Sequence, residues 1–377
     1  MSSATKVATV TSAKREERRA YWVMILPAFV LYLFVMAFPT IISVFLSLSN
    51  YNGGKLFGGQ AWGLTGFAQY THLFGDRFFW NALANNMWIV VISVFGQIPL
   101  GFLFAYIIYR KLVKAPAFWQ GVLYMPSIIS TIVIGLLWQT IFSPFGPVAE
   151  IMNTLYKADF HTHVTALLAG GVTLDDAGIQ SLIKLANPDS LSIFSQPVQD
   201  LKDFVATYSS NTSGELADDL TNLLFNKWKT DFMSQPGVAM IPVLFVILWL
   251  YTGFYLIIFL ANLQKIDESI IEAAKIDGAS EFQILKSIII PAMSGVIVTS
   301  AILAISGSLK SFDLVYAMTG GGPAKITQIL AIYMYDTAFR GSPNYPLANA
   351  ISTVMVVVSF LLIGVTRTVE QRYGGKE

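Results

Sequence analysis

Six long runs of apolar residues constrain what this chain of 377 residues can fold into. A helix needs about 20 consecutive, mainly apolar residues to cross the hydrocarbon core of a bilayer, and each run reaches that length. Only 12% of the residues are charged, against about 25% in a typical soluble domain. The runs therefore predict six transmembrane helices. They are Tyr21–Leu48, Leu83–Ile108, Phe118–Phe142, Val238–Leu263, Ile288–Tyr316 and Ala348–Thr368.

The predicted fold class is all-α, a polytopic membrane helix bundle of six transmembrane helices with an exported helical insert between the third and fourth. The loop after the third run is too long for a simple connection and switches to a soluble composition, with helix-like pieces such as 214–232. Its acidic residues outnumber its basic ones, which suits either a docking surface for an extracytoplasmic protein or a solvated cap without a partner. The predicted segments are an N-terminal tail at 1–20, three transmembrane helices within 21–142, the insert at 143–237, three more within 238–368 and a C-terminal tail at 369–377.

Basic residues mark one side of the membrane. They cluster before the first run, in the second loop, in the fourth loop and after the last run, which share a side if six helices alternate. By the positive-inside rule that side is the cytoplasm, so both termini and the loop at 264–291 are predicted to be cytoplasmic. The clusters are Lys6, Lys14, Arg15, Arg18 and Arg19; Arg110, Lys111 and Lys114; Lys265, Lys275 and Lys286; and Arg367, Arg372 and Lys376.

The composition excludes several classes of function. A formal net charge of +1 leaves no basic surface to neutralise the phosphates of a nucleic acid. The chain has no cysteine, which excludes disulfides and thiolate chemistry, and its three histidines lack the spacing of metal ligands. The segment Gly320–Thr327 has the wrong spacing for a P-loop. We therefore expect no metal site, no nucleic-acid partner and no nucleotide site in this chain.

One polar stretch, "EAAKIDGASEFQILKSIIIP" at Glu272–Pro291, lies between the fourth and fifth apolar runs. The pattern predicts a helix that begins near Asp267 or Ser269, either of which can cap it. Gly278 inside a helix costs about 1 kcal/mol relative to Ala, so it predicts a break between two short helices. Small residues and carboxylates favour the close approach of another protein, while an amphipathic helix lying on the membrane is the alternative. The small residues are Ala273, Ala274, Gly278 and Ala279, and the carboxylates are Glu272 and Asp277.

The same stretch resembles the cytoplasmic signature E-A-A-x3-G-x9-I-x-L-P of permease subunits in ATP-binding-cassette importers. The matching residues are Glu272, Ala273, Ala274, Gly278, Ile288 and Pro291. The chain departs from the signature only at Ile290, where leucine is usual and differs little in volume. In that family the segment forms a coupling helix that sits in a groove on the ATPase subunit. The resemblance implies this role for residues 264–291, here named the EAA loop. The implied coupling residues are Glu272, Ala273, Ala274, Asp277, Gly278, Ala279 and Ser280.

Further segments resemble the carbohydrate-uptake importers related to the maltose transporter. They are "ILPAFVLYLFVMAFP", "NLQKIDESIIEAAKIDGAS" and "FDLVYAMTGGGPAKITQILAIYMYDTAF". The run FD-x-VY-x-MTGGGP at Phe312–Pro323 is typical of the first of two non-identical permeases in such systems. In the maltose system the large exported loop interrupts a different connection, so the resemblance does not extend to the insert.

The resemblance also implies what this chain works with. It implies a non-enzymatic permease subunit in a bacterial plasma membrane, without a cofactor of its own. The implied partners are a second permease, two copies of a cytoplasmic ATPase that binds ATP and magnesium, and an extracytoplasmic solute-binding protein. The implied substrate is a sugar, which we expect to be an oligosaccharide.

Ionisable residues inside a span are costly and usually face a pore or a partner. Lys310 and Asp313 lie in the outer part of the fifth run at i, i+3, close enough to pair on one helix face. With Ser306, Ser308 and Ser311 they form either a stripe along a translocation path or permease interface, or a local ion pair at the membrane surface. The fourth run adds aromatic residues, which serve sugar stacking or simple packing. The predicted substrate-path residues are Tyr255, Ser311, Asp313, Lys310 and Trp249.

Two other classes of membrane protein are alternatives. A secondary transporter driven by an ion gradient would place carboxylates near the midplane of several spans and show inverted repeats. An integral membrane enzyme would gather His, Asp or Glu at the membrane face. Apart from Lys310 and Asp313 the runs contain almost no ionisable residue. Neither class accounts for the EAA loop. We keep the ion-gradient-driven transporter as the alternative to the importer permease.

Overall fold

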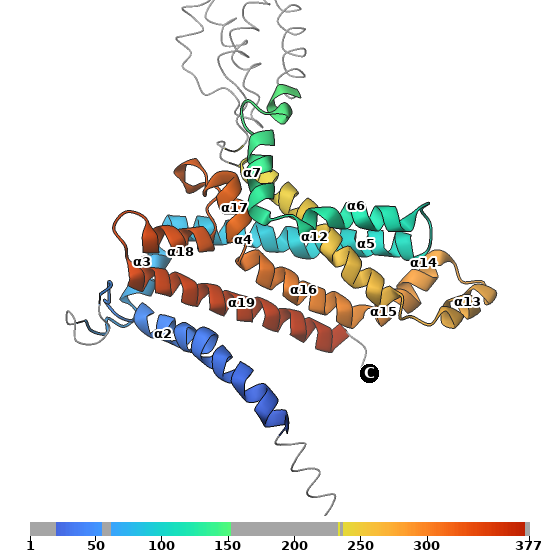
Figure 1. The fold of residues 1–377 in the computed structure, drawn as a ribbon, viewed down its shortest axis with the longest axis horizontal. Helices are drawn as coiled ribbons and strands as arrows, with labels where there is room; N and C mark the ends of the chain where they lie inside the picture. Colours follow the sequence, from blue (N-terminus) through green and yellow to red (C-terminus); the bar gives the residue numbers. More distant parts are fainter. Residues whose placement is uncertain (1–19, 55–61, 152–232, 234–236, 374–377) are drawn as a thin grey trace, which may run out of the picture. The chain divides into compact units, whose positions relative to one another are not determined.

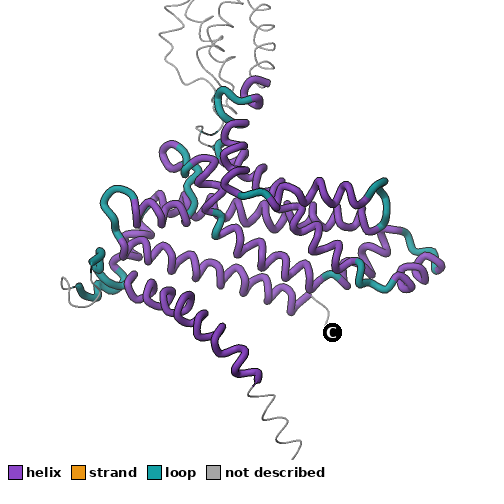
Figure 2. The backbone as a smooth tube through the Cα atoms, in the orientation of Figure 1, coloured by secondary structure: helices purple, strands orange, loops and turns teal. Residues whose placement is uncertain are grey.

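Helices make up all the regular secondary structure in the part of the chain that the computed structural model describes. One isolated antiparallel bridge joins Ser49 to Leu64, and Figure 2 shows helices connected by loops. The all-α prediction is confirmed over these residues. The described ranges are 20–54, 62–151, residue 233 and 237–373, so most of the predicted insert and parts of both predicted tails lie outside them.

The chain divides into two compact units, one formed by 1–77 with 333–358 and the other by 78–332 with 359–377. Figure 1 labels the main α-helices; in the text, η denotes a π or 3-10 segment. In chain order they are η1 Leu33–Ala37, α2 Phe38–Ser47, α3 Ala68–Gly75, α4 Arg77–Ile92, η2 Ser93–Gln97, α5 Ile98–Tyr109, α6 Pro116–Ile128, α7 Thr131–Ile141, α12 Met240–Leu263, α13 Glu268–Ile276, α14 Glu281–Ile284, η3 Leu285–Ile289, α15 Ile290–Ala292, α16 Ser294–Leu309, α17 Phe312–Thr319, η4 Pro323–Lys325, α18 Leu330–Phe339 and α19 Tyr345–Tyr373.

Four helical segments are long and apolar enough to cross a membrane unbroken. They are Ala20–Ser47, Arg77–Tyr109, Met240–Leu263 and Tyr345–Thr368. Two further pairs of helices pass the same test only together, because the chain bends by 94° between α6 and α7 and by 65° before α16. The described residues thus hold four candidate spans, or up to six if each bent pair is one span. The sequence predicts each of the third and fifth runs as one span, and the structure shows a sharp bend in both places.

Three π-helical turns interrupt the long helices, and each is followed closely by a proline. The turns are η1, η2 and η3, and the prolines are Pro39, Pro99 and Pro291. Proline lacks a backbone N–H, and its ring clashes with the carbonyl four residues earlier. At η2 the amide of Ile98, directly before Pro99, bonds instead to the carbonyl of Ser93, five residues back. The wider turn keeps the helix continuous where proline would otherwise kink or break it.

Hydrogen bonds between distant segments hold the first unit together. Ser43 Oγ in α2 donates to Asn349 Oδ1 in α19 over 2.6 Å. The Tyr333 hydroxyl in α18 donates to Asp76 Oδ2 over 2.5 Å. Burial of the phenol, together with this hydrogen bond and the charge of Asp76, raises the pKa of Tyr333. These contacts join the N-terminal segment to the part of the chain after residue 332.

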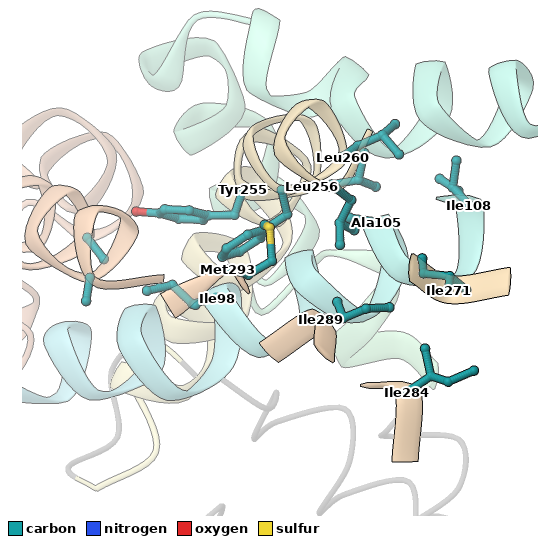
Figure 3. Packing of buried hydrophobic residues seen from close by; sticks show 14 residues of the cluster. Ile98, Ala105, Ile108, Tyr255, Leu256, Leu260, Ile271, Ile284, Ile289 and Met293 are labelled. Atoms are coloured by element: carbon teal, nitrogen blue, oxygen red, sulfur yellow. The ribbon is translucent and has the colours of Figure 1, made fainter. Parts of the chain in front are cut away.

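The core of the second unit is a cluster of apolar side chains contributed by six helical segments. The most extensive helix pair is α5 with α12, and α12 also lies against α6 (Figure 1). Figure 3 shows isoleucines of the EAA loop in the same cluster as residues of α5 and α12. The cluster is Ile98, Ala105, Ile108, Tyr255, Leu256, Phe259, Leu260, Leu263, Ile271, Ile284, Ile289, Met293, Ala301 and Ala304. The polar EAA loop is therefore anchored in the apolar core.

Two buried asparagines of α4 satisfy backbone groups of the segment before α18. The Asn85 amide donates to the carbonyls of Ile326 and Gln328, each over 2.9 Å. Asn86 Oδ1 accepts from the Leu330 amide over 2.8 Å, and its Nδ2 donates to the Ser308 carbonyl over 3.1 Å. Buried backbone groups are costly without partners, so α4 fixes the path of this loop.

Gly253 brings α12 into direct backbone contact with α6. A Cβ atom at Gly253 would lie 2.0 Å from the carbonyl oxygen of Leu123 and 2.8 Å from Tyr124 Cα. Both are backbone atoms and cannot move aside as a flexible side chain would. Small residues of this kind let membrane helices pack closely, so the α6–α12 contact requires glycine here.

We expect Gly253→Leu to separate α6 from α12 and to destabilise the fold, because overpacking typically costs about 1–3 kcal/mol. The measurement is the midpoint of thermal unfolding of the purified protein in detergent. Gly121→Leu is the matched control, since no atom lies within 4 Å of a Cβ built at that glycine of α6. Equal midpoints for the two variants would contradict the close contact.

Candidate functional site

The EAA loop folds as two short helices separated at Gly278. Asp267 caps α13, since its Oδ1 accepts from the Ser269 amide over 3.0 Å. The hydrogen bond from the Ser269 backbone amide is the main cause that lowers the pKa of Asp267, and the Ser269 side chain adds to it. α13 ends at Ile276, and Gly278 has a φ of +83°, which a side chain would make unfavourable. The predicted cap and the predicted break at glycine are both confirmed.

The second helix of the EAA loop begins with a capping box. The Ser280 amide donates to Gln283 Oε1 over 2.7 Å, and the Gln283 amide donates back to Ser280 Oγ over 3.4 Å. This reciprocal pairing satisfies two of the free amides at a helix start. Ser280, which the family resemblance implies as a coupling residue, has this structural role within the loop.

The inner side of the EAA loop packs into the core. Ile271 is 1% exposed and Ile284 is 0% exposed, and Ala274 and Ala279 pack against the same cluster. Ala273 is exposed instead. The predicted small residues therefore do not form one exposed surface, because two of the alanines face the core.

The outer side of the EAA loop carries exposed apolar residues beside exposed charges. Ile276 is 86% exposed and Phe282 is 70% exposed. Glu272 and Asp277 are also exposed, and their carboxylates form no hydrogen bond or ion pair with other described residues. Exposed apolar groups rimmed by polar ones mark interaction surfaces, so the outer side has the composition of a docking face.

The C-terminal end of α5 holds the start of α14. The Arg110 guanidinium forms a hydrogen-bonded ion pair with Glu281 Oε1. The Tyr106 hydroxyl, one turn earlier in α5, donates to Glu281 Oε2 over 3.2 Å. The Arg110 side chain is 12% exposed and that of Glu281 is 61% exposed. Sequence reasoning missed this contact, since 171 residues separate its charged partners.

A second candidate site is a cavity of about 230 Å³ in the second unit. η2, α12 and α16 supply most of its wall, and Ser311, the residue before α17, completes it. The predicted path residues Tyr255 and Ser311 both line it. Figure 3 shows the Tyr255 hydroxyl pointing away from the other labelled side chains of the core cluster. The polar lining residues are Ser93, Gln97, Tyr251, Tyr255, Ser308 and Ser311.

The polar groups of the cavity wall are neutral and partly engaged. Gln97 Nε2 donates to the Ile247 carbonyl over 2.7 Å, which leaves its Oε1 free to accept. Ser308 donates to Ala304 or Ser93, and Ser311 donates to Gly307. The hydroxyls of Tyr251 and Tyr255 form no hydrogen bond with another described residue. Together the wall offers uncharged donors and acceptors, which suit a ligand rich in hydroxyl groups.

Three predicted path residues lie outside the cavity wall. α16 ends at Leu309 and α17 starts at Phe312, so Lys310 and Asp313 do not share a helix face at i, i+3. Both are exposed and form no ion pair in the described structure, although the Asp313 carboxylate interacts electrostatically with the Tyr251 phenol. Trp249 packs edge-on against Trp138, with ring centroids 5.5 Å apart. The predicted continuous stripe is therefore wrong, and only its serines 308 and 311 reach the cavity.

Ser93 and Gln97 are the cavity residues that sequence reasoning missed. They begin and end η2, in a run that the sequence presents as a plain apolar span. The available signal is an S-x3-Q pair two residues before Pro99 in that run. A proline inside a predicted span therefore marks where polar side chains are to be sought.

Comparison with known proteins identifies the family. Residues 97–375 match the family described as "Binding-protein-dependent transport system inner membrane component". The chain is 28% identical over 346 residues to the probable ABC transporter permease protein YurN of Bacillus subtilis (strain 168), covering 90% of this chain and 92% of that protein. It is 27% identical over 361 residues to the lactose transport system permease protein LacF of Rhizobium radiobacter, covering 93% and 96%.

A solved structure with a similar fold is that of a bacterial alginate ABC transporter in complex with an alginate pentasaccharide-bound periplasmic protein. The TM-score is 0.64 at 17% sequence identity, and the match covers 97% of this chain and 98% of that one. The likeness confirms the fold. With several membrane-spanning helices and a family match over most of its length, the chain belongs to the inner membrane components of binding-protein-dependent transport systems, as the sequence predicts.

Proposed function

We propose that this chain is the permease subunit of an ATP-driven importer for a sugar, and that its EAA loop couples it to a cytoplasmic ATPase. The outer side of the EAA loop carries this proposal. Ile276 and Phe282 are large apolar side chains exposed beside carboxylates, while Ile271 and Ile284 fix the loop in the core. A loop built in this way offers a firmly supported surface to a second protein.

The proposed partners follow from the family. Two copies of an ATPase subunit bind ATP and magnesium, and a second permease completes the translocation path. A solute-binding protein delivers the sugar from outside, and both termini of this chain lie in the cytoplasm. Relatives named for lactose transport and for multiple sugar-binding transport support a sugar as the substrate. Hydrolysis then takes place in the ATPase, and this chain supplies the coupling and part of the path.

The cavity is the proposed contribution of this chain to the sugar path. Its wall presents the neutral hydroxyls of Tyr251 and Tyr255 beside the amide of Gln97. Sugar hydroxyls both donate and accept hydrogen bonds, so this mixed lining matches them. An ion-gradient-driven transporter is expected to have a titratable carboxylate in a cavity within its spans. The described residues that line this cavity include no carboxylate. The cavity thus favours the importer over that alternative.

The direct test is purification through this chain in mild detergent, followed by reconstitution in lipid. We expect an ATPase subunit to co-purify and its hydrolysis to rise with the solute-binding protein and its sugar. Lactose and maltotriose are the first probes, because relatives are named for lactose and for starch degradation products. Absence of any co-purifying ATPase would contradict the proposal.

Charge and polarity changes on the outer side of the EAA loop test the docking face. We expect Ile276→Asp to weaken association with the ATPase by about 30-fold or more, since truncating an anchor residue of an interface typically costs at least about 2 kcal/mol. Glu272→Lys should act in the same direction. The amount of ATPase that co-purifies is the measurement. Leu112→Asp, at a residue 68% exposed in another loop, should leave it unchanged, and equal losses in all three variants would refute the docking face.

The backbone at Gly278 gives a second, independent test of the loop. No atom lies within 4 Å of a Cβ built at Gly278, so a substitution acts through its φ of +83° alone. Strain of this kind costs about 1–3 kcal/mol, and Asn tolerates the left-handed region better than a β-branched residue. We expect Gly278→Val to reduce uptake strongly and Gly278→Asn to retain most of it. The opposite order would show that conformation is not the reason for the glycine.

The cavity is tested by removing one hydroxyl. Tyr255→Phe keeps the ring that packs in the core and deletes only the oxygen that lines the cavity. A lost hydrogen bond costs about 0.5–1.5 kcal/mol, so half-saturation of uptake should rise about 2- to 10-fold. Tyr124→Phe, in α6 and outside the cavity wall, is the control. An unchanged half-saturation for Tyr255→Phe would remove the cavity from the sugar path.

A further inference from the structure

The end of α5 interacts with both helices of the EAA loop. It forms hydrogen bonds with α14 and shares a buried apolar cluster with α13 and α14. Glu281, the first residue of α14, receives the Arg110 guanidinium on one carboxylate oxygen and the Tyr106 hydroxyl on the other. Both oxygens are thereby held by groups one turn apart in α5. We name these three residues the Glu281 clamp. The clamp fixes the orientation of α14 relative to α5, since two separate contacts prevent rotation about either one.

An apolar contact lies beside the clamp. Ile108, in the last turn of α5, is in the same buried cluster as Ile271 of α13 and Ile284 of α14 (Figure 3). Apolar burial is non-directional, so it holds the loop against α5 without setting its angle. Hydrogen bonds are directional, and the Glu281 clamp supplies this missing constraint.

The helix that carries the clamp also reaches the cavity. Residues Arg77–Tyr109 form one continuous helical segment of 33 residues, which includes Tyr106 at one end and Gln97 at the cavity wall. Gln97 lies roughly 20 Å from Arg110 along the helix axis, at 1.5 Å per residue. Gln97 bonds to α12 through the Ile247 carbonyl, and Ser93 bonds to Ser308 of α16. A displacement of the clamped end would therefore move Gln97 and Ser93, and with them the cavity wall.

We propose that the Glu281 clamp is the mechanical joint of this permease, through which movement of the EAA loop is passed along α5 to the cavity. The inference rests on the proposed function, because it assumes that an ATPase moves the loop. Arg110 and Tyr106 are positioning residues, since they act on the loop through Glu281. The clamp makes the loop and α5 move as one body; without it the buried isoleucines still hold the loop in place, but its angle to α5 becomes free.

A simple surface ion pair is the competing explanation, and it predicts a different result. The pair is open to solvent on its Glu281 side, which is 61% exposed, and ion pairs that water reaches contribute little to stability. Under either explanation Arg110→Ala should therefore leave thermal unfolding and ATPase co-purification close to those of the parent protein. Only the joint predicts that the loop loses its fixed geometry to α5. The discriminating measurement must therefore follow the geometry through the nucleotide cycle.

The experiment is a spin-label distance measurement in the complete complex. The chain has no cysteine, so Phe95→Cys in η2 and Ser287→Cys in η3, both exposed, give one defined pair of labels once the cysteines of the partner subunits are replaced. The probes are the nucleotide-free state and Mg-ATP trapped with vanadate. In the parent protein we expect the same distance in both states, because the loop and α5 move together. In Arg110→Ala we expect the distance to shift between the states by more than the width of the parent distribution.

Matched variants distinguish the loss of the contacts to Glu281 from a nonspecific effect of substitution near the end of α5. Lys114→Ala removes an exposed cation from the loop between α5 and α6, which also contains Arg110. Tyr109→Phe removes a hydroxyl that forms no hydrogen bond with another described residue. Both variants should give the same distances as the parent protein. Tyr106→Phe should give a smaller shift than Arg110→Ala. The exchange of Arg110→Glu with Glu281→Arg should restore a single distance.

The outcomes distinguish the two proposals. A nucleotide-dependent shift in the Arg110→Ala variant that the charge exchange reverses supports the joint. An unchanged distance in that variant overturns it while leaving the permease function intact, and so does a parent distance that already shifts between states. If no ATPase co-purifies with the parent chain, the proposed function itself fails and the joint fails with it.

Discussion

Backbone hydrogen bonding in lipid is the constraint on which the rest of this structure depends. No water is present in the bilayer core to satisfy a free carbonyl, so a span has to pair its own backbone groups. Prolines break this pairing, and the chain answers at Pro39, Pro99 and Pro291 with a π turn directly before each. The helices continue through these points with one wider turn instead of a break.

Two of these wider turns, η2 and η3, lie in the proposed functional regions. η2 presents Ser93 and Gln97, its first and last residues, to the cavity. η3 lies within the EAA loop, where it contributes Ile289 to the core. A π turn changes the register of the side chains that follow it, which is one reason such turns are frequent at functional sites. At η2 the π turn lies shortly before Pro99 and places two polar side chains in an otherwise apolar span.

The polar EAA loop keeps its place through apolar burial. Full burial of Ile271 and Ile284 stabilises the docked loop by about 3–6 kcal/mol in total, which exceeds what exposed ion pairs provide. This arrangement frees the outer side of the loop from any structural duty, so Ile276 and Phe282 can be exposed without loss of the fold. The position of the loop and the chemistry of its surface are set by different residues.

The sequence predicts those features that depend on neighbouring residues and fails where distant ones decide. The apolar runs, the cap at Asp267 and the break at Gly278 are local, and the structure contains all of them. The break between α16, which ends at Leu309, and α17, which starts at Phe312, places Lys310 and Asp313 outside one helical register, which the sequence pattern could not anticipate.

The third run shows the same limit. It looks like one span, yet it bends by 94° at two residues of extended backbone, Ile129 and Ser130. The buried α6–α12 contact through Gly253 lies between segments more than a hundred residues apart. Such contacts override local helix preference, and no pattern within either segment reveals them.

One helical segment connects every part of the second unit that carries a proposed role. From one end to the other, Arg77–Tyr109 presents asparagines to the loop before α18, then Gln97 to the cavity, then Tyr106 to the EAA loop. These polar side chains bond to groups of other elements, and they are spaced along one helical segment that continues through the π turn η2. The arrangement therefore links the EAA loop, the cavity and the loop before α18 through one helical segment, whose polar residues are the points of contact.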